Sequence, residues 1–515
     1  MVVRLNKISV KLVLVLSCII VVVFFISSVL WSTEISLSIN YTQETALYHN
    51  DIIWIHILVI LPASFTVYFF IFKRETEKIP LKLVRNIISL LIVICTCLLI
   101  VTVKVEPVSD SQRVLWYADD MLAGNFRSLL PDGYLYYFPH QLGLVAYSIV
   151  LTLIAGDYNY ILSQYINVVM LVLMYIYFHK ICRILFNDEK IELLVLILVP
   201  LFLPILFYVT FHYGTVIGFT LSIAAIYCQL RFFETRKIPY GILCAVFIGF
   251  AILFRNNYLI VLIAIVIFYL LDAICEKKRM SLLFACAAFL LFLGVDAGVR
   301  LGFSAASGHE INEGVPAITF VAMGLQEGDR APGWYNSYNH IVYYENNYDI
   351  SATESAAREN IRESLAGFST DITGAFGFFG RKVLSMWNDP AFQGIWVIET
   401  RVNSLDDTGF GRSLQNGLVR NILWWIMNSY HSLILFGASV YFVTGFKTVK
   451  RNQLIPVVIF IGWVIFHMFW EAKSQYAVVA FILLIPYAAG GYIKFCDVIE
   501  KVLKGYPFLC KKKEV

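Results

Sequence analysis

Long apolar runs, separated by short charged segments, constrain the fold of this chain more than any other feature. A helix needs about 20 consecutive apolar residues to cross the hydrocarbon core of a membrane. Hydrophobic residues make up 59% of the 515 residues and charged residues 15%, which is more apolar surface than a water-soluble domain can bury. We therefore predict an all-α polytopic membrane protein with about twelve transmembrane helices. The predicted spans are 12–31, 52–72, 86–105, 161–178, 191–210, 214–230, 239–254, 258–275, 281–300, 421–446, 454–470 and 476–493.

Basic residues fall mostly on one side of the predicted membrane. One set of segments carries 26 Lys and Arg residues, whereas the short loops on the opposite side carry four. Because basic residues concentrate in cytoplasmic loops, we predict that the basic side is cytoplasmic. We expect a multi-pass protein of a bacterial plasma membrane with both termini in the cytoplasm, and a basic tail, Lys511–Lys513, near the anionic inner leaflet. The basic segments are 1–11, 73–85, 179–190, 231–238, 276–279, 447–452 and 494–515.

This orientation decides how residues 141–178 are placed. The chain lies outside before them and inside after them, so they make one net crossing, and only one of their two apolar runs can span. We take 161–178 as the span and expect 141–155, which is short, to be interfacial or re-entrant. The predicted domains are an N-terminal transmembrane hairpin (1–85), a seven-helix membrane module (86–300) with the external loop 106–140, an extracytoplasmic loop domain (301–420), and three C-terminal transmembrane helices with the basic tail (421–515).

The polar stretch Glu106–Gln141 carries a helix signal between two apolar runs. Pro107 ends the preceding span, and Ser109 with Gln112 has the spacing of a capping box. Gly124 supplies a stop signal for the same helix. The stretch therefore predicts a short helix that begins just after the membrane.

This predicted helix, 110–123, has two distinct faces. At 100° per residue, Asp110 and Asp120 share a polar face with Arg113 and Tyr117, whereas Asp119 points away toward water. The polar face adjoins an apolar stripe, as expected for an amphipathic helix at a membrane surface. The stripe consists of Val114, Leu115, Ala118, Met121 and Leu122.

The sequence has no nucleotide-binding fingerprint and no Cys/His cluster with metal-site spacing. An activated substrate would therefore reach the outer face without a nucleotide, and a lipid-phosphate donor meets that requirement. Asp110 is the first candidate catalytic residue, because a helix N-terminus favours an ionised carboxylate that can act as a general base. Asp120, on the same face, is the second. The alternative is that Asp110 is only a favourable residue for starting a helix.

Cations at the outer face are few, and each is a candidate for binding phosphate. Arg255, Arg300 and Lys473 lie at the outer ends of predicted spans and could hold a phosphate by charge-assisted hydrogen bonds. The alternative is that they form local ion pairs, Asp296 with Arg300 and Glu471 with Lys473, or extend to the membrane interface.

The external loop resembles that of C-type glycosyltransferases. Asp110, followed by the pair Asp120-Met121 and then by Gly124, is similar to the first external loop of the protein O-mannosyltransferase and aminoarabinose transferase group, and of uncharacterised Gram-positive relatives. The segment Tyr134–Leu142 takes the place of a Tyr…Pro-Pro-Leu segment in that group. Seven predicted spans before a large external loop also match the superfamily's membrane module.

The resemblance implies an inverting transfer of a sugar from a polyprenyl-phosphate donor to a cell-wall or surface glycopolymer, a lipid or a protein. Asp110 would deprotonate the acceptor, and no nucleic acid is expected as a partner. Some relatives use a divalent metal, but Ser111 replaces the second acidic residue of the family's pair, which favours a metal-independent reaction. The implied substrate-binding residues are Arg255, Arg300, Lys473, His140, Gln141, Glu471 and Tyr476.

Two other classes of protein compete with this interpretation. A transporter or flippase of lipid-linked saccharides also has about twelve spans, but no pair of Gly/Pro-broken helices occurs in matching halves and charges within spans are scarce. A non-catalytic membrane scaffold would leave the acidic external loop unexplained.

Overall fold

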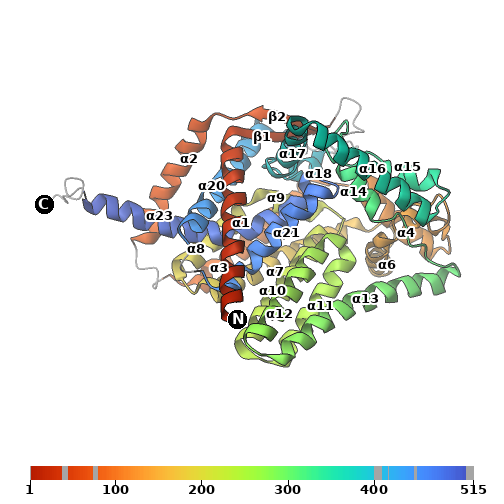
Figure 1. Cartoon of the computed structure of the whole chain (residues 1–515), viewed down its shortest axis with the longest axis horizontal. Helices are drawn as coiled ribbons and strands as arrows, with labels where there is room; N and C mark the ends of the chain where they lie inside the picture. Colours follow the sequence, from red (N-terminus) through yellow and green to blue (C-terminus); the bar gives the residue numbers. More distant parts are fainter. Residues whose placement is uncertain are drawn as a thin grey trace.

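The computed structural model describes residues 2–37, 44–73, 79–399, 409–415, 417–445 and 449–505. The predicted basic tail, Lys511–Lys513, lies outside the described residues. The chain forms a bundle of membrane helices with a layer of shorter helices at one end, upper right in Figure 1. The bundle consists of α1 (Val2–Leu30), α2 (Ile53–Val67) with the π-helical turn η1 (Tyr68–Phe72), α3 (Leu81–Val103), α7 (Tyr160–Phe186), α8 (Glu189–Leu201), α9 (Leu203–Phe207), η5 (Tyr208–Thr210), α10 (Thr215–Thr235), α11 (Ile238–Phe254), η6 (Asn256–Tyr258), α12 (Leu259–Cys275), α13 (Arg279–Ser307), α20 (Leu418–Thr444), η7 (Arg451–Leu454), α21 (Ile455–Phe469), α22 (Ser474–Phe481), η8 (Ile482–Leu484) and α23 (Ile485–Gly505).

The described helices confirm the polytopic membrane fold. Ten of them are long and apolar enough to cross a membrane, or up to 12 if two bent helix pairs each count as one span. The predicted span 191–210 is one of these pairs, bent by 53° after Leu201. The predicted span 239–254 is the shorter apolar helix α11.

The run 141–155 departs from a straight span, as its length predicted. It forms most of a helical segment, Pro139–Ala155, that is bent by 100° from the segment Arg127–Tyr137 before it. A bend of this size describes a broken span or a re-entrant loop. The outer segments of this region are α4 (Ser109–Leu122), η3 (Arg127–Leu129), α5 (Tyr134–Tyr137), η4 (Pro139–Gln141) and α6 (Leu142–Ala155).

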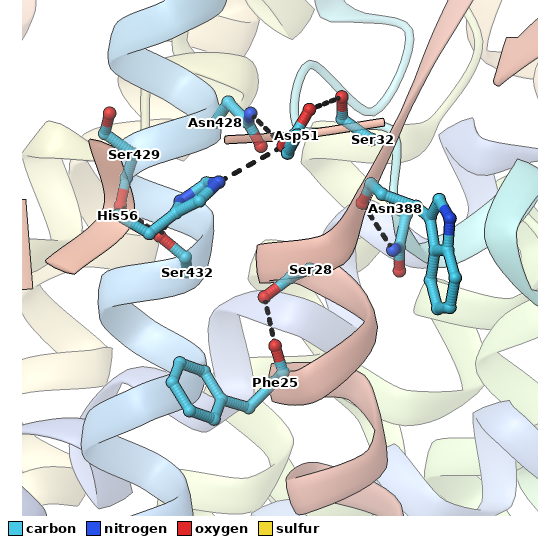
Figure 2. Close-up of polar contacts among 10 residues, drawn as sticks. Phe25, Ser28, Ser32, Asp51, His56, Asn388, Asn428, Ser429 and Ser432 are labelled. Carbon is cyan, nitrogen blue, oxygen red and sulfur yellow. Dashed lines mark hydrogen bonds and ion pairs between the residues drawn. The ribbon is translucent and has the colours of Figure 1, made fainter. Parts of the chain in front are cut away.

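A two-stranded sheet is the one non-helical element in the described part of the chain, and the sequence did not predict it. The strands β1 (Trp31–Leu37) and β2 (Glu44–Asn50) pair antiparallel, with Trp31 opposite Asn50. Their outer edges are also paired: Thr33 N donates to the Asn388 carbonyl (2.8 Å) and Ala46 N to the Arg330 carbonyl (3.0 Å). The Asn388 side chain donates to the Trp31 carbonyl (2.8 Å; Figure 2). The hairpin is therefore held by the long external loop, which explains why a local pattern did not reveal it.

The long loop that the sequence analysis places outside the membrane folds into helices over one end of the bundle. Figure 1 shows β1 and β2 beside α17, and α14, α15 and α16 near α4. This layer closes over the segment between α21 and α22, because Ala472 N donates to the Gly333 carbonyl (2.8 Å). The helices of the loop are α14 (Ile318–Gly324), α15 (Tyr338–Glu345), α16 (Ile350–Thr370), α17 (Ile372–Trp387), α18 (Gly394–Glu399) and α19 (Gly409–Gln415).

Candidate active site

Helix α4 presents Asp110 in its first turn, but the predicted capping box is wrong. The N-cap is Val108, no side-chain capping bond is present, and Ser109 has a φ of +52°. Ser111 Oγ donates to the Val108 carbonyl instead (2.8 Å). The turn after Pro107 places Ser109 in the left-handed region, so its side chain does not reach the position of a cap. The predicted stop is confirmed, since α4 ends two residues before Gly124, whose φ is +83°.

The apolar stripe of α4 is buried by protein. Val114, Leu115, Ala118 and Met121 are buried, whereas Leu122 is 44% exposed. Val114, Ala118 and Met121 join a cluster with residues of α6 such as Leu142 and Val145. The predicted amphipathic helix is therefore fixed against the bent segment, and its polar face is left open.

Asp110 belongs to a hydrogen-bonded chain with two residues of other elements. Tyr213, just before α10, donates its hydroxyl to Asp110 Oδ2 at 3.4 Å and accepts from Gln141 Nε2 at 2.9 Å. Burial first, and then the Asp110 charge, raise the pKa of Tyr213, so the phenol stays protonated and acts as a donor. The Asp110 side chain is 47% exposed and lies 3.6 Å from Arg113 Nη1.

Arg255 is held beside this chain by aromatic rings. Its Cζ lies 5.3 Å from the ring centre of Tyr213 and 5.1 Å from that of Tyr476. Its Nη1 donates to Thr215 Oγ1. Among the described residues no carboxylate forms an ion pair with Arg255, so its cation–π contacts leave guanidinium N–H groups available.

Glu471 is linked to Arg255 through Tyr476, whose ring contacts the Arg255 guanidinium. The Tyr476 hydroxyl donates to Glu471 Oε1 at 3.1 Å. Burial raises the pKa of Glu471, Lys473 opposes that shift, and Glu44 and Asp110 add to it. The structure thus brings together five of the predicted site residues, Asp110, Gln141, Arg255, Glu471 and Tyr476, from five separate elements.

The other two predicted cations are already paired. Lys473 Nζ lies 2.8 Å from Glu44 Oε1 on β2, and not in the predicted pair with Glu471. Arg300 Nε lies 2.9 Å from Asp296 Oδ2, as the alternative interpretation predicted. Their positive charges are therefore offset locally, in contrast to that of Arg255.

His140 and Arg300 lie at a separate hollow of about 350 Å³ between α6, α11 and α13. Two lining residues of this hollow are sequence neighbours of the Asp110 cluster, which consists of Asp110, Gln141, Arg255, Glu471 and Tyr476. His140 precedes Gln141, and Asn256 follows Arg255. The remaining wall is mostly apolar. It consists of Pro139, Leu142, Gly143, Gly249, Ile252, Leu253, Phe292, Val295, Asp296 and Val299.

The three aspartates of α4 differ in their partners. The prediction that Asp119 faces water is wrong. Its Oδ1 accepts from Thr152 Oγ1 (2.9 Å) and its Oδ2 from Tyr158 N (3.0 Å). These donors reach Asp119 because α6 folds back against α4. Helical periodicity within α4 cannot predict such a contact. Asp120 is partly exposed and lies three turns along α4 from Asp110, at the opposite end of the helix.

Several residues of this region were not predicted. Tyr213 connects Asp110 to Arg255, yet nothing sets it apart from the other tyrosines, of which the chain has 30 in all. Lys382 of α17 is buried and donates to the carbonyls of Gly324, Met468 (3.1 Å) and Trp470 (2.9 Å). It fastens the external loop to the segment that carries Glu471.

Within the part of the chain that the structure describes, no group of three or more His, Cys, Asp or Glu side chains is arranged to hold a metal ion. The neighbours of Asp110 are a phenol that donates to it, an amide that donates to the phenol, and a guanidinium that forms an ion pair with it at 3.6 Å. This donor set does not fit a metal site, and we derive no step through a metal.

Residues 144–295 match the family model described as dolichyl-phosphate-mannose-protein mannosyltransferase. The match covers less than a third of the chain, lies within the predicted membrane module, and agrees with the predicted resemblance to C-type glycosyltransferases. No curated protein sequence matches the chain.

Two solved structures with a similar arrangement are oligosaccharyltransferases of Archaeoglobus fulgidus. One is the apo form, with 13% identity and a TM-score of 0.44 over 85% of this chain. The other is AglB in complex with an inhibitory peptide and a dolichol-phosphate, with 15% identity and a TM-score of 0.41 over 86% of this chain. This chain spans 53% of the length of each.

Proposed function

We propose that this membrane protein transfers a sugar from a polyprenyl-phosphate donor to an extracytoplasmic acceptor. The observation that carries the proposal is that Asp110 and Arg255 both contact Tyr213, Asp110 at its hydroxyl and Arg255 at its ring. Transfer from a lipid phosphate needs a base for the acceptor and a cation for the leaving group at one place. The family description, which names a lipid-phosphate mannose, supports the class of donor.

Asp110 is the general base in this proposal. It accepts the proton of the acceptor hydroxyl or amine while that atom forms a bond to the anomeric carbon of the sugar. The helix N-terminus and the Tyr213 hydroxyl stabilise the carboxylate before the reaction. Its 47% exposed side chain leaves an oxygen accessible to an acceptor. Groups with this role contribute about 10²–10⁴-fold to a rate.

Arg255 holds the leaving group. As the bond between the anomeric carbon and the phosphate oxygen breaks, negative charge develops on the phosphate, and the guanidinium stabilises it by charge-assisted hydrogen bonds. Tyr213 and Tyr476 fix the guanidinium plane from two rings. Because attack and departure occur on opposite sides of the anomeric carbon, the product has inverted stereochemistry.

The hollow between α6, α11 and α13 would receive the polyprenyl chain next to the phosphate. Most of its lining residues are apolar, which suits a hydrocarbon, and four are polar: His140, Asn256, Asp296 and Arg300. His140 and Asn256 are adjacent in sequence to Gln141 and Arg255. The donor would thus run from the lipid-facing helix α13 to the Asp110 cluster.

The test is transfer of radiolabelled sugar from a polyprenyl-phosphate donor by purified protein in vesicles, comparing Asp110→Asn with the unmodified protein. Asn keeps the size of the side chain and removes the base, so we expect the rate to fall about 10³-fold. Asp157→Asn, at an exposed aspartate between α6 and α7, is the matched control and should keep the normal rate.

The same vesicles distinguish a transferase from a flippase. A transferase releases polyprenyl phosphate and forms labelled acceptor, whereas a flippase moves intact donor across the bilayer. Normal transfer by Asp110→Asn would show that Asp110 is not the base. Translocation without any labelled product in the unmodified protein would show that the transferase proposal is wrong.

A further inference from the structure

A second hollow lies among β1, α18 and the start of α20. It is separated from the Asp110 cluster by the segment Glu471–Gln475. Ser474 Oγ and Gln475 N of this segment donate to side chains that line the hollow, whereas Glu471 faces Tyr476. The side chains that matter for recognition are Glu34, Asp389, Gln393, Trp396, Arg420 and Trp424.

Three N–H groups at this hollow are enclosed but have no partner among the described residues. They are Gln393 Nε2, Arg420 Nε and Trp424 Nε1. Gln393 is 1% exposed, and its Oε1 accepts from Gln475 N (3.1 Å), which fixes the amide so that Nε2 is left over. Burying a donor without a partner costs about 1–3 kcal/mol, so three at one hollow indicate a ligand that accepts hydrogen bonds.

Trp424 is not explained by its position near the membrane surface alone. Tryptophans at the membrane interface usually direct their indole N–H toward water or head groups. Here the indole Nε1 is buried at the hollow. Its neighbour Trp425 is 41% exposed and does not line the hollow.

The charges at the hollow disfavour an anion. Glu34 forms an ion pair with Arg420 (2.5 Å), so the one cation among the described residues that line the hollow is already neutralised. Asp389 is a second carboxyl, which accepts from Ser474 Oγ (2.7 Å), Ala391 N and Gln393 N. A phosphate would meet two acidic groups and one paired cation. A neutral ligand meets no such repulsion.

We propose that this hollow binds a neutral saccharide. Sugar hydroxyl oxygens accept from the three free N–H groups, and their protons are donated to the remaining lone pairs of Glu34 and Asp389. The apolar face of a sugar ring packs on the indole rings of Trp396 and Trp424, in the combination of aromatic surface and a few placed polar groups that is typical of ligand sites. Resting on the proposed function, we assign the saccharide to the acceptor.

Binding is measured directly by ¹⁹F NMR of protein labelled with 5-fluorotryptophan. The Asp110→Asn protein is used, so that the result does not depend on transfer. Trp424→Phe identifies the Trp424 signal. The probes are methyl α-mannopyranoside and a neutral mannobiose, with inorganic phosphate as the anionic comparison. We expect the saccharides, and not phosphate, to shift the Trp424 signal in a saturable way.

Gln393→Glu tests the mechanism of recognition. It keeps an oxygen to accept from Gln475 N and replaces the free donor by an acceptor, so we expect saccharide binding at least fivefold weaker. Trp425→Phe is the matched control and should bind as the parent does. A saturable response to phosphate without one to saccharides, no response to either saccharide, or equal binding by Gln393→Glu would overturn the proposal.

Kinetics then test the assignment to the acceptor in the protein with Asp110 intact. We expect Gln393→Glu to raise the acceptor KM at least fivefold while the donor KM stays unchanged. Saccharide binding in the NMR experiment with no transfer by the unmodified protein would contradict the proposed function and leave the site standing. A raised donor KM would instead assign the hollow to the donor sugar and contradict the acceptor assignment.

Discussion

Two carboxylates near the outer ends of the membrane helices, Asp110 and Asp51, have opposite surroundings. The Asp51 side chain is 2% exposed and accepts from Ser32 Oγ (2.5 Å), Asn428 Nδ2 (2.7 Å) and His56 Nε2 (3.2 Å), as Figure 2 shows. Burial raises the pKa of Asp51, but these hydrogen bonds outweigh it and leave the pKa below its usual value. Asp110 is half exposed and has longer contacts.

The Asp51 network links an Asp, a His and a Ser by successive contacts, as in a catalytic triad. However, its serine is not arranged to act as a nucleophile. His56 Nδ1 lies 2.9 Å from Ser432 Oγ, but the Ser432 hydroxyl donates to the Ser429 carbonyl (3.0 Å). His56 and Ser432 are also buried. A serine nucleophile must give its proton to the histidine and must meet a substrate. The network instead ties the end of β2 to α2 and α20, so short distances alone do not identify chemistry.

After Asp110, the largest expected effect is at Arg255. Arg255→Gln removes the charge that stabilises the leaving phosphate, and we expect kcat to fall about 10²–10³-fold. Arg255→Lys should recover part of this loss, because a lysine keeps the charge without the planar fork. Steady-state transfer assays measure both. The control is Arg127→Gln, an exposed arginine of the same face, and equal losses in Arg127→Gln and Arg255→Gln would contradict a specific role.

The hollow between α6, α11 and α13 allows a test of where the lipid part of the donor binds. Val295→Trp fills this hollow, and we expect the donor KM to rise at least tenfold, equivalent to about 1.4 kcal/mol of binding, with kcat little changed. Val150→Trp places the same bulk on an exposed position of α6 away from the hollow. An unchanged donor KM in Val295→Trp would show that the lipid binds elsewhere.

A substitution in the buried Asp51 network should lower the stability of the protein and leave the rate of sugar transfer unchanged. His56→Phe leaves Asp51 and Ser432 without their histidine partner, at a cost of about 1.5–3 kcal/mol for a hydrogen bond to a charged group. We expect a lower thermal unfolding midpoint and normal transfer per folded molecule. His309→Phe, at an exposed histidine, is the control. Loss of transfer without loss of stability would give the network a catalytic role.

Lys382 predicts a smaller, pH-dependent change in stability. Burial lowers the pKa of Lys382 from its usual value to about 7, with Glu471 opposing that shift. Between that value and the ordinary lysine pKa, the unfolded chain binds more protons than the folded one, so stability should rise with pH from about 7 upward. We expect a steeper rise of the thermal midpoint between pH 7 and 9 than in Lys382→Met. If the thermal midpoints of the unmodified protein and of Lys382→Met changed with pH in parallel, the three carbonyls would be keeping Lys382 charged.

The membrane fold was predictable because the length of an apolar run is a property of local sequence. The end of α4 shortly before Gly124 followed from a glycine stop signal, and the buried face containing Val114 and Ala118 followed from helical periodicity. The sequence analysis named Asp110 for its place in the first turn of the predicted helix, and Arg255 together with Arg300 and Lys473 because cations at the predicted outer face are rare.

What the sequence could not provide were contacts between distant segments. The partner of Lys473 is Glu44, on a hairpin whose edges are paired with the external loop. Asp119 is held by Thr152 because α6 folds back against α4. Tyr213 links base and cation, yet its position is set by the loop before α10 and no local pattern indicates it.

The central claim, that Asp110 acts chemically whereas Asp51 acts structurally, is tested most directly by the same substitution in both places. Transfer per folded molecule and the thermal unfolding midpoint are measured for Asp110→Asn and for Asp51→Asn. We expect Asp110→Asn to lose about 10³-fold in rate with an unchanged midpoint, and Asp51→Asn to lower the midpoint with an unchanged rate. Equal rates for Asp110→Asn and the unmodified protein, or a rate loss confined to Asp51→Asn, would contradict the account.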